Sequence, residues 1–195
     1  AIILDIKIGS GAFMKSLEDA IVLGEEMVAI GTNYGRETLA LITNLEEPLG
    51  RAVGNTLEIK EAIELLQGKG PDDLYDLCIE LCSYLLVLAK RVAHVDEGRL
   101  LLDDKVQSGA AFDKFLELVH YQEGDMHHIK DPHLFPKAKH ILEVKSDQAG
   151  YVKALNAEEV GRVALHRGAG RETLDSVIDY SAGIILNKKI ESKRS

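Results

Sequence analysis

The sequence lacks the features that mark several common classes of protein. Its longest apolar stretch, residues 81–89, is too short to span a bilayer, and no secretory signal peptide is visible, so we expect no membrane partner. The formal net charge is −9 without a concentrated basic stripe, which argues against nucleic acid as a main partner. Residues 188–194 are locally basic, and such a tail is more often a solvated chain end.

Cysteine is scarce, since only Cys78 and Cys82 occur. Their i, i+4 spacing places them on the same face of one apolar helical run, not in a metal-binding knuckle. We interpret them as small buried residues of a protein from a reducing compartment, which favours a cytoplasmic location. The nucleophile elbow of hydrolases, the Walker phosphate loop and the zinc-protease motif are also missing from the sequence.

The composition that remains is that of an ordinary globular protein, 46% hydrophobic and 28% charged, with a chain long enough to bury a core. Residues 1–4 are an apolar run, residues 16–31 carry a helical apolar stripe, and residues 37–43 read as a second buried strand. This β-α-β order predicts an α/β fold with a parallel sheet and flanking helices. Because a buried strand stands at the extreme terminus, we expect further sequence upstream of Ala1.

The character of the sequence changes after residue 122. Helices are expected at residues 55–67, 71–91, 96–108 and 110–122. Beyond the next stretch, residues 141–145 and 151–155 alternate as strands, and residues 157–166 suggest a short helix. We therefore predict a large α/β domain at residues 1–122, an aperiodic linker at 123–140 and a smaller, incomplete α+β domain at 141–195.

The most informative segment reads DIKIGSGAFM and begins at Asp5. Asp5 and Lys7 project to one face of a strand that ends in a Gly-x-Gly turn and then feeds a helix, which is where α/β proteins hold ligands. Gly9 allows a backbone bend, and Gly11 allows another group to approach closely. The third glycine of a dinucleotide fingerprint is absent, which disfavours a dinucleotide.

Two side chains of this segment have two interpretations each. Lys7 can meet an anionic substrate group, or it can form a mutual pair with Asp5 at the edge of the sheet. Phe13 can flank a planar base, or it can fill the core under the following helix. The residues alone do not choose between these alternatives.

The loop that begins at Pro48 reads PLGRAVGN and is followed by the carboxylates Glu58 and Glu61. Irregular backbone carbonyls with a carboxylate are suitable ligands for a hard cation. Asn55 and Glu58 instead fit the start of a helix, as the cap and its third residue. The cation interpretation therefore attaches to Glu61.

Two further clusters have simple explanations. The histidines in or beside the linker have no fixed ligand spacing, so we interpret them as mostly exposed residues and not as a metal site; they are His120, His127, His128, His133 and His140. Residues 168–171, which read GAGR, can cradle a phosphate, but a glycine turn after a short helix is the commoner explanation.

The sequences of these motifs resemble those of the pyrimidine-nucleoside and thymidine phosphorylases. Residues 5–14 resemble the family's D-V-K-x-G-x-G-A-F-M, and residues 48–62 resemble its P-L-G-x-x-x-G-N-x-L-E-V-x-E-A. Blocks at residues 68–74 and 168–183 also agree, so the resemblance covers essentially the whole chain in order. The chain departs from the family pattern at Asn44–Leu45, at Glu123 and after Lys189.

The resemblance implies the phosphorolysis of uridine, thymidine or deoxyuridine to the free base and ribose or deoxyribose 1-phosphate. It implies inorganic phosphate as co-substrate, a structural monovalent cation such as potassium, and a homodimer formed through a helical domain outside this chain. A hinge is expected to close two domains on the substrates. The family's phosphate loop and base-holding residues would lie upstream of Ala1. We therefore expect the catalytic residues there and no activity from this piece alone.

The resemblance also assigns site residues by position. Phe13 matches the aromatic residue that packs against the base. The backbone carbonyls of Leu49 and Ala52 and the carboxylate of Glu61 match the ligands of the cation. The strand motif adds four substrate-binding candidates, Asp5, Lys7, Gly9 and Gly11.

Two other functions stay open. An anthranilate-type phosphoribosyltransferase shares the fold, but it would use magnesium-bound pyrophosphate and lack the second domain, so residues 141 onward speak against it. A non-catalytic module could instead hold a regulatory nucleotide at the Gly-x-Gly edge.

Overall fold

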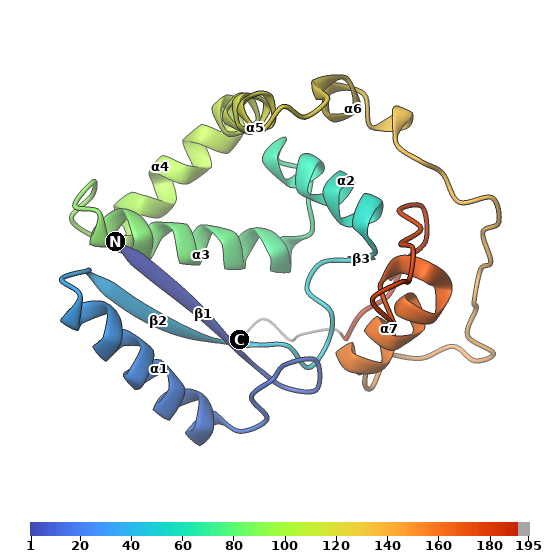
Figure 1. Cartoon of the computed structure of the whole chain (residues 1–195), viewed down its shortest axis with the longest axis horizontal. Coiled ribbons are helices and arrows are strands. Elements are labelled where there is room, and N and C mark those ends of the chain that lie inside the picture. Colours follow the sequence, from blue (N-terminus) through green and yellow to red (C-terminus); the bar gives the residue numbers. More distant parts are fainter. Residues whose placement is uncertain (191–195) are drawn as a thin grey trace.

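The structure, a computed structural model, describes residues 1–190; the end of the predicted basic tail and of the predicted C-terminal domain lies outside the described residues. Two strands, β1 (Ile2–Ile8) and β2 (Thr38–Asn44), pair in parallel along their whole length. The helix α1 (Leu17–Asn33) connects them and lies along one face of the pair (Figure 1). The predicted β-α-β unit and its parallel pairing are confirmed.

The helix α1 begins and ends at the residues that its sequence indicates. Ser16 Oγ accepts the N–H of Asp19 at 3.1 Å and donates to the Asp19 carboxylate at 2.8 Å, which caps the first turn. The helix is closed at the other end by Gly35, which has a φ of +70°. On the inner side, a Cβ added to Gly24 would lie only 3.1 Å from Ile6 Cδ1. The helix therefore packs directly on β1.

The two faces of β1 contact different helices. Ile6 is buried and faces α1. Asp5 and Lys7 point to the other face, and α3 (Asp72–Leu88) contacts β1 as well. The predicted alternation of Asp5 and Lys7 against the isoleucines is therefore present in the structure.

The helices after the sheet form an arc beside it (Figure 1). They are α2 (Asn55–Leu66), α3, α4 (Val95–Gln107) and α5 (Ala110–Tyr121). Along the contact between α3 and α4, a Cβ added to Gly98 would lie 3.1 Å from the Cα of Ser83, and the Tyr75 hydroxyl donates to Asp103 at 2.6 Å. All four helices were predicted within a few residues of their observed bounds.

The predicted cap of α2 is wrong. Gly54, with a φ of +137°, occupies the cap position, and Asn55 is the first helical residue. The Glu58 carboxylate accepts the N–H of Gly54 at 2.9 Å, so the acidic residue does stabilise the helix start. The Asn55 side chain instead donates to the carbonyl of Ala169 at 2.9 Å. The observed cap lies one residue before the predicted one, because the backbone conformation at the cap position favours glycine.

The predicted linker contains two short helical turns, α6 (Met126–Lys130) and η1 (Pro132–Leu134). Asp125 and Asp131 cap them by accepting the N–H groups of His127 and His133. Such short turns show no sequence period, which is why the pattern did not predict them.

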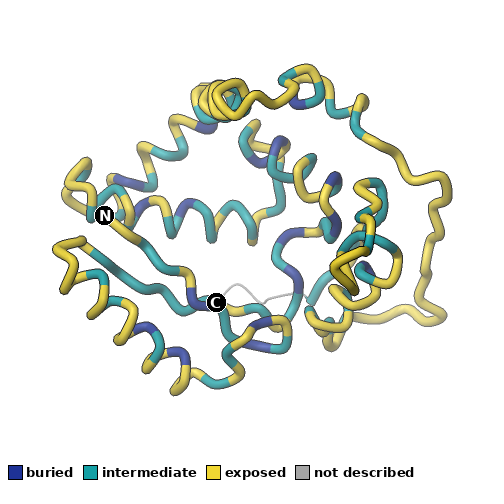
Figure 2. The backbone as a smooth tube through the Cα atoms, in the orientation of Figure 1, coloured by how far each residue is buried: buried dark blue, intermediate teal, exposed yellow. Residues whose placement is uncertain are grey.

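The strands predicted at residues 141–145 and 151–155 do not form, so this prediction is wrong. The segment is extended, but none of the described residues pairs with it, and Ile141 and Val144 are 88% and 91% exposed. Figure 2 shows it as a long exposed stretch. An alternating pattern becomes a strand only where another backbone offers hydrogen bonds.

The rest of the C-terminal part folds against the first part. The helix α7 (Ala157–Ala164), which was predicted, continues into the π turn η2 (Leu165–Ala169). A short strand, β4 (Ile184–Ile185), pairs antiparallel with β3 (Ala52–Val53). The mixed α/β fold class is confirmed.

Two further sequence-based predictions can be compared with the structure. None of the helices formed by residues 1–190 has the length and apolar character to cross a membrane. Cys78 and Cys82 are free, but only Cys78 is partly buried and Cys82 is exposed, so the prediction that both are buried is wrong. Burial and the neighbouring Cys82 raise the pKa of the Cys78 thiol.

Candidate functional site at the carboxyl edge of the sheet

Two loops leave the carboxyl ends of β1 and β2 and are hydrogen-bonded to each other. The N–H of Leu45 donates to the carbonyl of Ile8 at 2.7 Å, and the N–H of Gly11 donates to the carbonyl of Leu45 at 3.0 Å. Ser10 contributes twice, because its Oγ donates to the Glu46 carbonyl at 2.8 Å and its N–H donates to Glu46 Oε2 at 3.2 Å. The prediction that both loops share one edge of the sheet is confirmed.

Each glycine of the Gly-x-Gly turn has a structural reason. Gly9 has a φ of +122°, and a Cβ there would lie 2.8 Å from the backbone of Leu45 and Glu46. A Cβ on Gly11 would lie 2.6 Å from the Cβ of Ala157, the first residue of α7. The group that approaches the second glycine closely is therefore α7.

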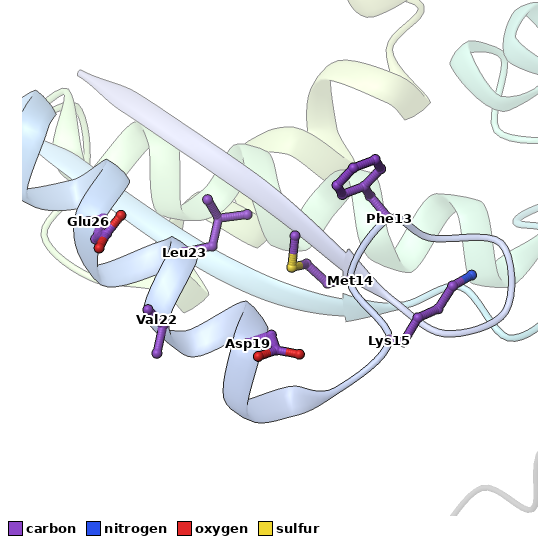
Figure 3. A pocket seen from close by; sticks show the side chains of 7 residues that line it. All are labelled: Phe13, Met14, Lys15, Asp19, Val22, Leu23 and Glu26. Atoms are coloured by element: carbon purple, nitrogen blue, oxygen red, sulfur yellow. The ribbon is translucent and has the colours of Figure 1, made fainter.

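Phe13 lies at the tip of the same turn, and we call residues 9–15 the Phe13 loop. Its side chain is 94% exposed, which excludes the alternative that it fills the core. It borders an open pocket of about 440 Å³. Figure 3 shows the ring on the loop beyond the end of β1, while the opposite wall comes from α1. The remaining lining residues are Met14, Lys15, Asp19, Val22, Leu23 and Glu26.

Asp5 and Lys7 form a small polar network with Thr43 of β2. Lys7 Nζ lies 2.7 Å from Asp5 Oδ2 and donates to Thr43 Oγ1 at 3.1 Å, and the Thr43 hydroxyl donates to Asp5 Oδ1. The structure thus contains the mutual pair that the sequence offered as one alternative. A direct role of Asp5 or Lys7 toward substrate stays a prediction.

The Phe13 loop is anchored to the start of α7. The N–H of Ala157 lies 3.1 Å from the Glu46 carbonyl and 3.2 Å from Ser10 Oγ. Lys15 Nζ donates to the Ser10 carbonyl at 2.8 Å and lies 3.6 Å from Glu158 Oε2. Sequence reasoning missed these roles of Ser10, Lys15 and Glu46, because their partners are distant in the chain or belong to the backbone.

Two of the three candidate cation ligands, Leu49 and Ala52, lie in the loop of residues 48–53, which we call the oxygen loop. Glu61 Oε1 accepts the N–H of Arg51 at 2.8 Å and the N–H of Ala52 at 3.2 Å. Its other oxygen lies against Gly50, where a Cβ would come within 2.2 Å. The carboxylate of Glu61 therefore reaches from α2 into the loop that carries Leu49 and Ala52. Oxygen donors of this kind fit a hard cation and would not select a softer metal.

A carboxylate of α3 also holds the oxygen loop. Asp73 accepts the N–H of Gly50 at 3.1 Å and a hydrogen bond from Lys189. Partial burial acts to raise the pKa of Asp73, but Lys189 and the backbone N–H groups of Gly50 and Leu74 outweigh it and hold the pKa below its usual value. Sequence reasoning missed this pair as well, since 116 residues separate its two members.

The two remaining candidate clusters are the linker histidines and residues 168–171. Most of the linker histidines are exposed, and His128 Nδ1 contacts the Asp125 carboxylate at 2.9 Å. Among the described residues, no group of three or more histidine, cysteine, aspartate or glutamate side chains could hold a metal ion. Gly168 has a φ of +97° in the turn after α7, and its carbonyl accepts the N–H of Asp179 at 2.9 Å. The glycine-turn interpretation of residues 168–171 agrees with this geometry.

Two family models match the sequence, in order. The model described as "Glycosyl transferase family, a/b domain" matches residues 1–112, and the one described as "Pyrimidine nucleoside phosphorylase C-terminal domain" matches residues 151–193. The first match covers more than half of the chain and includes both loops at the carboxyl edge of the sheet. The class defined by fold and site is therefore this family of glycosyl transferases.

Curated relatives narrow the class. The chain is 47% identical over 190 residues to a protein of Staphylococcus haemolyticus (strain JCSC1435) named pyrimidine-nucleoside phosphorylase, covering 97% of the chain and 44% of the relative. It is 47% identical over 193 residues to the protein of that name from Staphylococcus aureus (strain USA300), covering 99% of the chain and 45% of the relative. The chain thus spans less than half the length of these relatives. It belongs to the pyrimidine-nucleoside phosphorylase family, as its motifs predicted.

Proposed function

We propose that this chain is part of an enzyme that cleaves pyrimidine nucleosides by phosphorolysis. A phosphate oxygen attacks the anomeric carbon of uridine, thymidine or deoxyuridine, and the bond from that carbon to the base nitrogen breaks. The base leaves with the electron pair and takes up a proton. The products are the free base and ribose or deoxyribose 1-phosphate.

The observation that supports this proposal most strongly is the order of the two family matches on one chain. The a/b domain alone is compatible with a phosphoribosyltransferase. A phosphorylase C-terminal domain over residues 151–193 is what that alternative lacks. The names of the relatives point to pyrimidine nucleosides and to phosphate as the second substrate.

The exposed ring of Phe13 supports the base as a ligand of this edge. A large apolar side chain that is almost fully exposed at the tip of an anchored turn is available to pack against a planar ring. The pocket beside it has the size of a small-molecule site. We therefore assign the base to the Phe13 loop, with Gly9 and Gly11 fixing the loop and with Asp5 and Lys7 supporting the strand beneath it.

The oxygen loop is assigned a structural role. The carbonyls of Leu49 and Ala52 and the carboxylate of Glu61 would hold a monovalent cation such as potassium. That ion would balance the charge of Glu61 and tie the loop to the start of α2. The catalytic residues and the phosphate loop are assigned to the portion of the relatives that this chain does not cover, so the chain alone would be inactive.

A homodimer in the cytoplasm completes the proposal. The two free cysteines agree with a reducing compartment. The dimer contact is assigned to a helical domain outside this chain.

The test is the dependence of base release on phosphate. The protein that contains this chain is purified, its intact mass is measured, and uracil release from uridine is followed at several phosphate concentrations. We expect a mass about twice that of the chain, release that rises with phosphate, and no release by the 195-residue chain alone. Release that is independent of phosphate, or supported only by pyrophosphate with magnesium, contradicts the proposal.

A further inference from the structure

A cluster of three charged side chains joins the oxygen loop to residues 184–190, which we call the C-terminal segment. Asp73, in the first turn of α3, accepts the N–H of Gly50 at 3.1 Å and also accepts from Lys189. Lys189 Nζ lies 3.7 Å from Glu47 Oε1, and the N–H of Ile190 donates to the other oxygen of Glu47 at 3.0 Å. One ammonium group therefore lies between two carboxylates, one from α3 and one from the residue directly before the oxygen loop.

The position of Lys189 is unusual for a lysine, since only 15% of its side chain is exposed. A charge in that position is stable only when it is paired, and here it is paired with both Asp73 and Glu47. The segment just before it is fixed by backbone contacts, because the N–H of Leu186 donates to the carbonyl of Arg51 at 2.8 Å and β4 pairs with β3. The C-terminal segment is thus docked on the oxygen loop itself.

The conformation of the oxygen loop depends on two carboxylates. The N–H groups of three successive residues, Gly50, Arg51 and Ala52, all donate to Asp73 or Glu61. Successive N–H groups that converge on anions hold a loop in one shape. Glu61 is a candidate cation ligand, whereas Asp73 is balanced by Lys189.

We propose that Asp73 and Lys189 are positioning residues for the oxygen loop, and that they couple binding of its cation to the docking of residues 184–190. The inference rests on the cation site of the function proposed above. Without Lys189, the carboxylates of Asp73 and Glu47 would repel each other and Gly50 would lose a fixed acceptor. Because coupling is reciprocal, a cation that stabilises the loop also stabilises the docked segment.

The experiment uses the 195-residue chain and compares Lys189→Met and Asp73→Asn with Lys188→Met, the same change at an exposed neighbouring lysine. Amide hydrogen exchange of residues 50–53 is measured without potassium. We expect exchange about tenfold faster in Lys189→Met and Asp73→Asn and unchanged exchange in Lys188→Met. Protection of α1 serves as the folding control, and Lys189→Arg, which keeps the charge, should restore most of the loop's protection.

A second measurement addresses the cation. The thermal unfolding midpoint is followed as potassium chloride replaces choline chloride at constant ionic strength. We expect the potassium concentration for half-maximal stabilisation to rise about tenfold in Lys189→Met, the effect typical of residues that orient metal ligands.

Failure of the positioning role and failure of the cation site would give different results. If residues 50–53 exchange equally fast in Lys189→Met and Lys188→Met, the positioning role is overturned, whatever potassium does. If potassium and choline give the unmodified chain the same midpoint, the cation site and its coupling are overturned. Faster exchange in Lys189→Met would then still support the positioning of the loop.

Discussion

The two loops at the carboxyl edge of the sheet differ in how they are held by the rest of the protein. The Phe13 loop is fixed at its base, where Gly9, Ser10 and Gly11 contact the neighbouring loop and α7, but it leaves the ring of Phe13 in solvent. The oxygen loop is held along its length, because α2, α3 and the C-terminal segment each contribute a hydrogen bond or an ion pair.

The difference separates a binding element from a supporting one. An exposed aromatic side chain on a rigid base loses little conformational entropy when it contacts a ligand. A loop in which three successive N–H groups donate to carboxylates presents no exposed aromatic side chain and instead fixes the relative positions of α2, α3 and β4. Substitutions at the foot of the Phe13 loop should therefore lower stability, whereas a substitution at its tip should weaken ligand binding. Substitutions in the oxygen loop should mainly lower stability.

The largest effect is expected at the base of the Phe13 loop. Gly9→Ala puts a Cβ at a φ of +122° and 2.8 Å from the backbone of Leu45 and Glu46, so it should lower the free energy of unfolding by about 3 kcal/mol. Chemical denaturation measures this. The matched control is Gly150→Ala, where an added Cβ meets nothing within 4 Å and the stability should stay the same. Equal stabilities of the two variants would show that the base of the loop is not rigid.

The next effect concerns the oxygen loop. Glu61→Gln removes the charge that accepts the N–H groups of Arg51 and Ala52, and it should lower the free energy of unfolding by about 2 kcal/mol. Glu64→Gln, the same change at an exposed position of α2, is the control and should have little effect. A Glu61→Gln variant as stable as the control would mean that the loop is held without this carboxylate.

A change at the tip should separate stability from binding. Phe13→Ala should alter the free energy of unfolding by less than about 0.5 kcal/mol, because the ring is exposed. In the full-length enzyme it should weaken uridine binding about tenfold, as expected for the loss of one stacking contact. Tyr34→Ala, another exposed aromatic residue, should change neither quantity. An unchanged KM for uridine in Phe13→Ala would contradict the assignment of the pyrimidine base to this loop.

The smallest effect is a pH dependence of the oxygen loop. Because the pKa of Asp73 is lowered in the folded state, its stabilising contribution is present above the unfolded value near 3.8 and is lost as the pH falls through the folded value. Asp73→Asn should therefore lose less stability than the unmodified chain as the pH falls from 5 to 3, in roughly the window of a carboxyl titration. Thermal unfolding at a series of pH values measures how the stability of each protein depends on pH. The same pH dependence in Asp73→Asn and in the unmodified chain would contradict the role given to Asp73.

Local signals in the sequence predicted much of this architecture. The apolar stripe of α1, its Ser16 cap and the two flanking strands predicted a parallel pair and the edge at which both loops meet. The backbone bend at Gly9 was predicted because glycine readily adopts a positive φ. These features depend on neighbours within a few residues or on a repeating period.

What the sequence did not predict depends on partners far along the chain. The alternation around Ile141 is a real strand pattern, but none of the described residues supplies the second backbone. The cap of α2 moved to Gly54 because of a backbone angle that no side-chain pattern encodes. Lys189 and Asp73 meet across 116 residues, and nothing near either of them indicates the other.

The identity of the sugar product tests the central proposal most directly. Full-length enzyme is incubated with uridine and inorganic phosphate, and the reaction is followed by phosphorus NMR while uracil is measured by absorbance. The account predicts that a phosphate ester of the pentose appears in the same amount as uracil while inorganic phosphate disappears. Uracil formed together with free ribose, at constant inorganic phosphate, would contradict it.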